Sequence, residues 1–363
     1  MEHMRYEYPA KRAVTRRAYV GVVGSGDLEV LLSPSQMANA EVVIRTSVDG
    51  YGHVWKSVLD RFFQRYDGAA KIELNDFGAT PGVVMLPPER SGGSQRRRSG
   101  MNAQDTFLAR HSFIELGTRE RAKALLDKGT FRELLGPFDR LESPWLAMQN
   151  IVCQADDGAV IARGTLDGKP AVIAAIEPAF QGGSIGEVSG AKIAAALEMA
   201  LSEIEAGRAI HPVVLFETGG VRLQEANLGL AVIAEIQAAI VALRCHVPVV
   251  GVIGGMVGCF GGMSLAGALC TELVMTRQAR LSMNGPEVIE QEAGVEELDA
   301  GDRRLIWSMI GGEERVAVGL ADTLVDDDID HVRHAVLAAF GRGVPRQHRT
   351  ENVDGFIARL AQE

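Results

Sequence analysis

The sequence predicts two domains, a small α+β domain followed by a larger α/β domain built on a mostly parallel sheet. The chain has 363 residues, which is enough for two domains. Its 41 glycines and an aromatic content of 6% are typical of closely packed α/β layers with many tight turns. Strands alternate with helices along residues 101–345, and a Gly/Ser/Pro-rich stretch separates them from residues 1–90.

The first domain, residues 1–90, is predicted to place one helix on an antiparallel sheet. Its expected strands are 18–23, 28–32, 41–48, 71–74 and 82–86. The first two flank Gly24-Ser25-Gly26-Asp27, which is a hairpin signal. The helix is expected at residues 53–66, where apolar side chains recur with helical spacing.

Residues 91–100 are predicted to be a linker. They are rich in glycine and serine, have no apolar periodicity and include Arg96, Arg97 and Arg98. Met101 follows directly, and our hypothesis is that it was the start of a once separate gene. We therefore place the domain boundary at this stretch.

The second domain, residues 101–345, is predicted to alternate strands and helices, and residues 346–363 form a polar tail with a helix at 352–361. The expected strands are 152–163, 169–176, 213–217, 249–253 and 271–276, and the expected helices are 118–135, 190–206, 221–244 and 261–270. The first two strands form a hairpin around Asp167-Gly168. Such alternation indicates a largely parallel sheet covered by helices.

Charge and cysteine content exclude several classes of protein. Residues 1–90 are neutral, residues 91–100 carry +3 and the remainder carries −13. An acidic body of this kind lacks the basic surface that nucleic-acid binding requires. The four cysteines have no C-x-x-C spacing, so we expect no zinc ribbon and no other metal site. The N-terminus lacks the apolar segment of a signal peptide, and we expect a reduced, cytoplasmic protein.

One uncharged segment, residues 247–271, is long enough to span a membrane. It contains seven glycines, however, and these weaken a helix. We therefore expect a buried strand, a glycine loop and a buried helix, with no membrane span.

Three glycine pairs stand out, each shortly before or at the start of a predicted helix: Gly182-Gly183, Gly219-Gly220 and Gly261-Gly262. None fits a P-loop or a dinucleotide fingerprint. Glycine pairs at a strand-to-helix turn expose backbone N–H groups, which suits an oxyanion hole or an anion cradle. The alternative is that these glycines only permit tight turns and close packing.

The segments GGSIGEVSGAKIAAALE, ETGGVRLQEANLGL and NGPEVIEQ resemble the β-type carboxyltransferase subunits of acetyl-CoA carboxylase. Within that group, residues 107–340 are most similar to the β subunits of malonate decarboxylases. The resemblance implies a crotonase-like fold built from ββα spiral units. The segments GVVGSGDLEVLL and NDFGATPGVV resemble the malonate decarboxylase acyl-carrier (δ) subunits, over residues 1–86.

These resemblances imply a lyase that decarboxylates a malonyl thioester on the carrier to an acetyl thioester through an enolate. Gly219 and Gly220 match the family's oxyanion loop, Gly261-Gly262 is a second candidate, and Gly182 and Gly183 support the cofactor arm. Ser25 matches the serine that carries phosphoribosyl-dephospho-coenzyme A. From the residues, Arg222 either pairs with the malonyl carboxylate or forms an ion pair with Glu225.

The resemblance also implies partners: a γ subunit that completes the active site, an α subunit that transfers the carrier, and a prosthetic-group transferase. Three alternatives stay open. The chain passes CO2 to biotin on another chain, since it has no biotin-accepting Met-Lys-Met of its own. It performs acyl-CoA hydratase chemistry on a related fold. Or it is a non-catalytic scaffold, which has no need for oxyanion-type turns.

Overall fold

The structure is a computed structural model that describes residues 1–21, 28–35, 37–78 and 111–360. It contains two compact units, Met1–Met101 with Pro137–Asp157, and Asn102–Gly136 with Gly158–Glu363. The predicted linker 91–100 and the predicted strand 82–86 lie outside the described residues. Each unit is described separately below.

The first unit contains a mixed sheet in the order β1-β5-β6-β4-β3, with β2 beside β6. Its strands are β1 (Glu2–Pro9), β2 (Arg12–Ala13), β3 (Ala18–Val20), β4 (Leu28–Pro34), β5 (Asn39–Thr46) and β6 (Gly68–Asp76). The expectation of a fully antiparallel sheet is wrong, because β5 and β6 are parallel. Helix α1 (Gly52–Phe63) joins these two strands as the crossover that parallel neighbours need.

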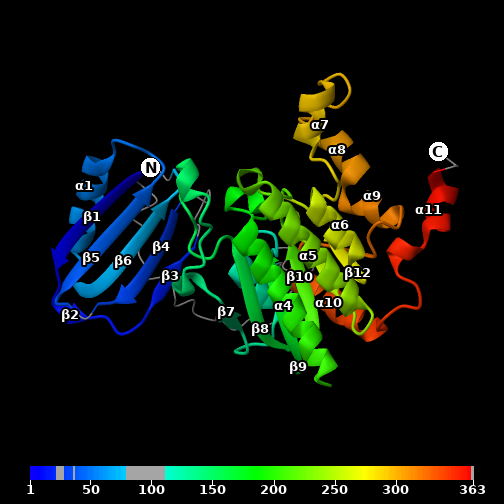
Figure 1. Cartoon of the computed structure of the whole chain (residues 1–363), viewed down its shortest axis with the longest axis horizontal. Coiled ribbons are helices and arrows are strands. Elements are labelled where there is room, and N and C mark those ends of the chain that lie inside the picture. The colour runs from blue at the N-terminus through cyan, green and yellow to red at the C-terminus, as the bar shows by residue number, and fades with distance from the viewer. Residues whose placement is uncertain (22–27, 36, 79–110, 361–363) are drawn as a thin grey trace, which may run out of the picture. The chain divides into compact units, whose positions relative to one another are not determined.

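Helix α1 covers one face of this sheet, and the hydrophobic core of the unit lies between them (Figure 1). Trp55 and Leu59 of α1 pack there with Val42 and Ile44 of β5 and Ile72 of β6. Side chains alternate between the two faces of a strand, which explains the alternating burial along β5. The main apolar cluster of this unit therefore lies on the helix side of the sheet.

The second unit contains a seven-stranded sheet in the order β13-β12-β11-β10-β9-β8-β7. Its strands are β7 (Arg132–Leu134), β8 (Ala159–Leu166), β9 (Lys169–Ile176), β10 (His211–Phe216), β11 (Val250–Ile253), β12 (Glu272–Thr276) and β13 (Thr323–Val325). Strands β9 to β13 are parallel, whereas β7, β8 and β9 are antiparallel neighbours. The largely parallel sheet is confirmed.

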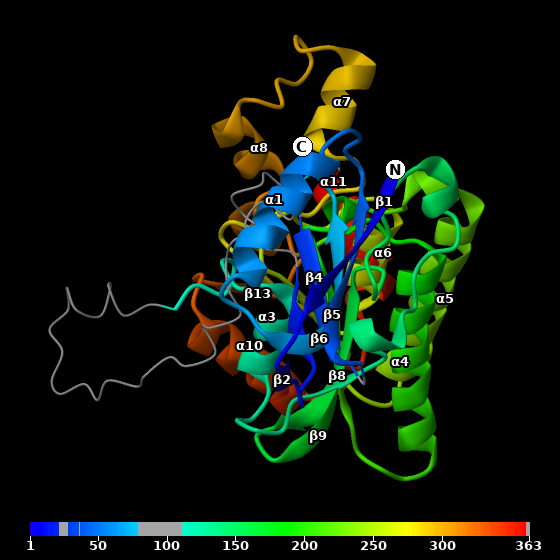
Figure 2. The ribbon, with the colours of Figure 1, turned by 90° about the vertical axis from the view of Figure 1, so that its left-hand side faces the viewer.

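Helices cover both faces of this sheet. The helices of this unit are α3 (Thr118–Leu125), α4 (Glu187–Glu205), α5 (Asn227–Arg244), α6 (Gly262–Leu269), α7 (Pro286–Ala293), α8 (Arg303–Ile310), α9 (Gly312–Ala317), α10 (Ile329–Arg342) and α11 (Val353–Leu360). Helices α4, α5 and α6 pack on one face, and α3 and α10 on the other (Figure 2). Along β10, Val214 and Phe216 belong to the first of these layers and Val213 and Leu215 to the second.

Short backbone bridges form an additional layer beyond the strand ends. Thr218 pairs with Cys259, and Cys259 pairs with Leu281. Each repeat thus consists of a strand, a bridging residue and a helix, which is the ββα unit that the resemblance implies. The segment 247–271 folds as the predicted strand, loop and helix.

Two predicted helices differ from the structure. The helix expected at 118–135 ends at Leu125, and the chain then forms β7, which pairs with β8. The helix expected at 221–244 begins only at Asn227, because Ala226 has a φ of +44° that no helix contains. Among the described residues, α5 is the one helix long and apolar enough to cross a membrane; buried core helices meet the same test.

Candidate functional site

Three glycine turns follow the carboxyl ends of three neighbouring parallel strands, β9, β10 and β11. In open α/β sheets this edge is the usual place for a ligand site. The N–H of Gly219 donates to the carbonyl oxygen of Gly182 at 3.0 Å. A Cβ atom on Gly220 would lie 3.1 Å from the Cα of Gly261. The structure therefore brings together all three glycine pairs that the sequence singles out.

Two positions in these turns require glycine. Gly220 has a φ of +103°, which L side chains rarely adopt, and it packs directly against Gly261. Gly183 has a φ of +68°, and a Cβ atom there would overlap with the carbonyl oxygen of Glu217. The turns thus pack backbone against backbone, with no side chain between them.

Three of the four predicted oxyanion donors already donate hydrogen bonds within the chain. Gly219 donates as described above, and Gly220 donates to the Thr218 hydroxyl at 3.0 Å. The N–H of Gly261 donates to the carbonyl oxygen of Met283 at 2.8 Å. In this conformation, these three N–H groups stabilise the turns themselves.

Two adjacent N–H groups are open. Among the residues that the structure describes, the N–H groups of Val221 and Gly262 have no hydrogen-bond acceptor. A Cβ atom on Gly261 would lie 3.8 Å from the nitrogen of Val221, so both donors adjoin the same glycine. Gly262 also begins α6, and the N-terminus of a helix favours negative charge. The arrangement is suited to an oxyanion.

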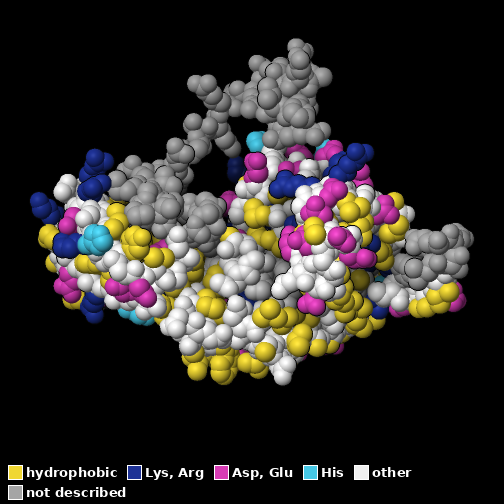
Figure 3. All heavy atoms as spheres, turned by 90° about the horizontal axis from the view of Figure 1, so that it is seen from above, with side chains coloured by type: hydrophobic (Ala, Val, Ile, Leu, Met, Phe, Trp, Pro, Cys, Tyr) yellow, Lys and Arg dark blue, Asp and Glu magenta, His cyan; other side chains and the backbone are white. Residues whose placement is uncertain are grey.

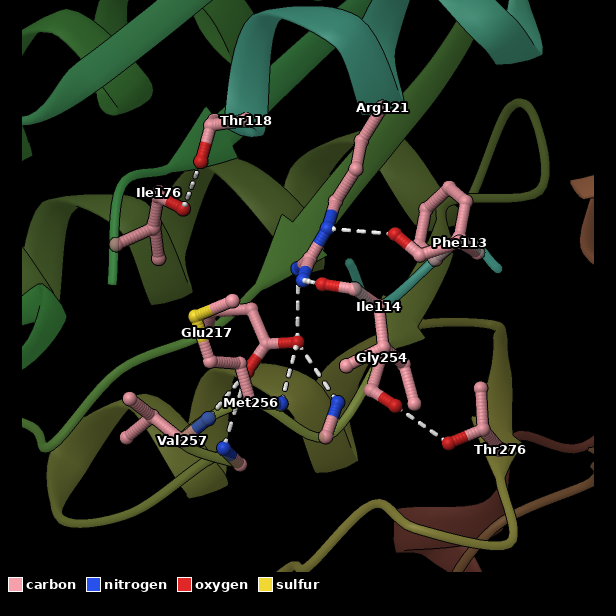
Figure 4. Close-up of polar contacts among 12 residues, drawn as sticks. Phe113, Ile114, Thr118, Arg121, Ile176, Glu217, Gly254, Met256, Val257 and Thr276 are labelled. Carbon is pink, nitrogen blue, oxygen red and sulfur yellow. Dashed lines mark hydrogen bonds and ion pairs between the residues drawn. The ribbon is translucent and has the colours of Figure 1, made fainter. Parts of the chain in front are cut away.

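The carboxylate of Glu217 fixes the loop 255–258, which leads to Gly262. Glu217 directly follows β10 and is 1% exposed. Its Oε1 accepts hydrogen bonds from Gly255 and Met256 at 2.7 and 3.3 Å, and its Oε2 accepts from Val257 and Gly258 at 2.8 and 3.1 Å (Figure 4). Four successive N–H groups around one anion form a nest, which fixes the backbone of the loop.

Arg121 of α3 neutralises this buried carboxylate. Its Nη1 lies 2.9 Å from Oε1 of Glu217, and both side chains are almost fully buried. Its Nε and Nη2 donate to the carbonyl oxygens of Phe113 and Ile114 at 3.0 and 2.5 Å (Figure 4). The two charges lie 96 residues apart in the sequence, and no motif links them, so sequence reasoning missed Arg121.

Arg222 is buried in an ion pair. It is 1% exposed, and its Nη1 lies 3.1 Å from Oε1 of Glu225. Its Nη2 donates to the carbonyl oxygen of Ser184 at 3.0 Å, and its guanidinium lies 5.2 Å from the ring centroid of Phe180. Of the two roles left open by the sequence, this geometry favours the ion pair over contact with a substrate.

Cys259 lies between the glycine turns but is not prepared as a nucleophile. Burial raises the pKa of its thiol well above the ordinary value, and the reactive form of cysteine is the thiolate. Its Sγ donates to the carbonyl oxygen of Met263 at 3.2 Å. Within the described residues, no cluster of three or more His, Cys, Asp or Glu side chains is arranged to bind a metal ion.

Ser25 lies outside the described residues. The strands on either side of it, β3 and β4, pair antiparallel with Val20 opposite Val30. This pairing is the one that the predicted hairpin requires.

Comparison with known families matches both parts of the chain. Residues 15–86 match the family described as malonate decarboxylase delta subunit, and residues 114–346 match the carboxyl transferase domain. A malonyl-S-ACP:biotin-protein carboxyltransferase of Malonomonas rubra is 41% identical over 65% of this chain and 77% of its own length. A malonate decarboxylase acyl carrier protein of Pseudomonas syringae pv. tomato is 47% identical over 25% of this chain and 92% of its own length.

Solved structures agree with these matches. A chain of a Pseudomonas malonate decarboxylase hetero-tetramer in complex with malonate is 60% identical, with a TM-score of 0.70, over 72% of this chain and 94% of that one. A transcarboxylase 12S chain is 29% identical, with a TM-score of 0.52, over 62% of this chain and 41% of that one. The second unit accordingly has the crotonase-like fold. The chain therefore belongs to the carboxyl transferase family and carries, at its N-terminus, a domain of the malonate decarboxylase acyl-carrier family.

Proposed function

We propose that this chain combines the carrier and β subunits of a malonate decarboxylase and converts a malonyl thioester to an acetyl thioester. The observation that carries this proposal is the group of stacked glycine turns with two open N–H donors, in a chain that also has the carrier domain. We assign residues 1–90 to the carrier, 91–100 to a linker, 101–345 to the catalytic domain and 346–363 to a tail.

Loss of CO2 leaves negative charge on the thioester oxygen as the enolate forms. Fixed N–H donors at that oxygen lower the barrier, because they need no reorganisation as the charge develops. We assign this role to the N–H groups of Val221 and Gly262. Gly219, Gly220 and Gly261 shape the turns so that no side chain keeps the substrate oxygen away from the backbone. This refines the sequence-based assignment of the oxyanion donors.

The carrier family implies a covalently attached prosthetic group. We propose that it is phosphoribosyl-dephospho-coenzyme A on Ser25. When bound, the group supplies the thiol that carries the acyl chain. At the site, a Cβ atom on Gly182 would meet nothing within 4 Å, so Gly182 leaves room for an extended arm. Gly183 supports the arm indirectly, because it lets the turn pack against the backbone of Glu217.

An intact-mass measurement tests this assignment. Protein produced with its full operon should carry an added mass of the size of the prosthetic group. That mass should disappear in the Ser25→Ala variant and remain in Ser33→Ala, a serine elsewhere in the same domain. Active protein with an unmodified Ser25 would contradict the carrier proposal.

The fate of CO2 separates the main proposal from its alternative. The Malonomonas rubra relative is named for transfer to a biotin protein, whereas the more similar Pseudomonas structure is a malonate decarboxylase. The higher identity of the second favours release of CO2. Adding avidin, which sequesters biotin, should therefore leave turnover of the assembled complex unchanged. Inhibition by avidin would support carboxyl transfer instead.

We propose three protein partners: a γ subunit that completes the site, an α subunit that transfers the carrier, and a prosthetic-group transferase. Related chains crystallise as hetero-oligomers. Exposed apolar side chains support a subunit contact: Leu230 and Val241, which lie on one side of α5, are 52% and 39% exposed, and Leu265 of α6 is 47% exposed. We call these three residues the α5–α6 surface. Figure 3 shows exposed hydrophobic side chains among the charged ones on the surface of the second unit. All four cysteines are free, which fits a cytoplasmic location.

A further inference from the structure

Residues 137–157 belong to the catalytic domain by sequence but to the carrier unit by structure. Residues 137–157 lie inside the carboxyl transferase match, which runs from 114 to 346. In the structure, however, Pro137–Asp157 belongs to the first unit, together with the strands of the carrier. A piece of the catalytic sequence thus packs on the carrier.

This segment lies on the polar face of the carrier sheet. The opposite, apolar face is covered by α1. Alternation along β4, β5 and β6 directs Glu29, Arg45, Glu73 and Asn75 away from α1. Arg45 is the register partner of Asn75, and Asn75 is the register partner of Glu29, so the polar side chains are neighbours.

Four charges of alternating sign connect this face with the segment. The guanidinium of Arg45 donates to both carboxylate oxygens of Glu142, at 2.7 and 2.9 Å. Arg140 lies 3.3 Å from Glu142 and also pairs with Glu73 of β6. The order is therefore Glu73, Arg140, Glu142, Arg45, with the outer two charges on the carrier and the inner two on the segment. The hydrogen bonds to Glu142 raise the pKa of Arg45.

Contacts at both ends of the segment extend this connection. Near its start, the guanidinium of Arg17 lies 5.2 Å from the ring centroid of Phe138. Near its end, the buried carboxylate of Glu29 accepts a hydrogen bond from the N–H of Ala155 at 3.2 Å. The same carboxylate accepts from the Asn75 amide at 2.5 Å. The segment is thus held near both of its ends.

We propose that residues 137–157 are the docking element through which the catalytic sequence holds the carrier domain, and that the four alternating charges specify this contact. Their side chains are 16–33% exposed, so salt should weaken the contact. A polar, salt-sensitive contact suits a carrier that has to be released and recaptured. The inference goes beyond the proposed reaction, because it concerns holding of the carrier and not the chemistry on it.

The test replaces residues 91–100 of the full chain with a protease site and cleaves the folded protein. Because 137–157 stays attached to the catalytic part, the two fragments should remain associated at about 50 mM salt and separate at about 500 mM. Sedimentation velocity reports the association without any need for activity. Fragments that separate at low salt would overturn the proposal.

Charge variants identify the residues that specify the contact. Arg45→Glu, and separately Glu142→Arg, should each weaken association of the fragments at least about tenfold. The double variant should regain most of it, which a merely misfolded carrier would not do. Lys56→Glu makes the same charge change on the exposed side of α1 and should leave association unchanged. Unaltered binding in both single variants would refute the role of these charges.

Discussion

At the scale of single residues, Gly220 allows the sharpest test of the proposed site. Gly220→Ala places a methyl group 3.1 Å from the Cα of Gly261 in a turn with a φ of +103°. The turn must move and displace the N–H donors beside it. We expect turnover to fall at least about 100-fold while the complex still assembles. Steady-state turnover and co-purification with the partner subunits measure the two effects.

The matched control for this variant is Gly343→Ala. Gly343 also has a positive φ, +73°, but a Cβ atom there would meet nothing within 4 Å. We expect a loss of about 1 kcal/mol in the free energy of unfolding and no loss of turnover. If Gly220→Ala were as active as Gly343→Ala, the oxyanion assignment would fail.

The buried ion pair of Glu217 and Arg121 predicts unequal effects of removing either partner. Glu217→Gln removes the negative charge beside the buried guanidinium of Arg121, which keeps only its two carbonyl acceptors. The free energy of unfolding should fall by about 3–5 kcal/mol. Arg121→Met leaves the Glu217 carboxylate with its four backbone N–H donors. The loss in the free energy of unfolding should therefore be smaller, about 1–3 kcal/mol. Urea unfolding of both variants gives the order, and the reverse order would refute the nest as the main stabilising contact.

At the scale of elements, local signals predicted the structure where local chemistry decides it. The hairpin of β8 and β9 turns at Asp167-Gly168, both with positive φ, as its sequence indicates. By contrast, residues 126–135 have helical spacing but do not form a helix, because residues 132–134 pair with β8. Strand β1 was missed since its pairing with β5 lies outside any local window. Long-range pairing therefore overrode local propensity.

Asp127 predicts a pH dependence of this hairpin. Its carboxylate accepts hydrogen bonds from the Thr165 hydroxyl at 2.6 Å and from the N–H of Gly168 at 2.8 Å. These hydrogen bonds, of which the one from Thr165 has the largest effect, hold the pKa of Asp127 below its usual value. Because the folded pKa lies below the unfolded one, the stabilisation is complete above about pH 4 and is lost as the pH falls through the folded value.

Asp127→Asn should therefore lower the thermal unfolding midpoint at pH 6, with a loss of about 1–2 kcal/mol from the weakened hydrogen bonds. As the pH falls below about 4 and then through the lower folded pKa, the difference from the unmodified protein should shrink, because the carboxylate becomes protonated first in the unfolded state and then in the folded state. Unfolding curves recorded between about pH 3 and pH 7 test this. A difference that does not change with pH would contradict the assigned cause.

At the scale of the whole molecule, the sequence predicted which turns form the site but not what holds them. The glycine pairs are short, local signals at the ends of strands, and the parallel sheet brings them together. Arg121 and Glu217 meet only in the folded chain, and so do Arg45 and Glu142. Both ion pairs join segments whose proximity depends on topology, which composition and spacing do not reveal.

The α5–α6 surface leads to a prediction about assembly. Helix α5 buries Ile236 and Ile240 in the core, whereas Leu230 on its outer side is 52% exposed. A monomer gains nothing from leaving such a surface in water, but a subunit interface buries it. Leu230→Glu would place a charge in that interface without a partner, so affinity for the proposed γ subunit should fall at least about tenfold.

Co-purification of the proposed γ subunit with the tagged chain measures this loss. Val353→Glu is the matched control, because Val353 of α11 is 56% exposed and lies outside the α5–α6 surface. It introduces the same charge and should leave assembly intact. Turnover should fall with assembly in Leu230→Glu and stay unchanged in Val353→Glu, since the proposed site is complete only in the complex. Normal co-purification of the Leu230→Glu chain would place the interface on another surface.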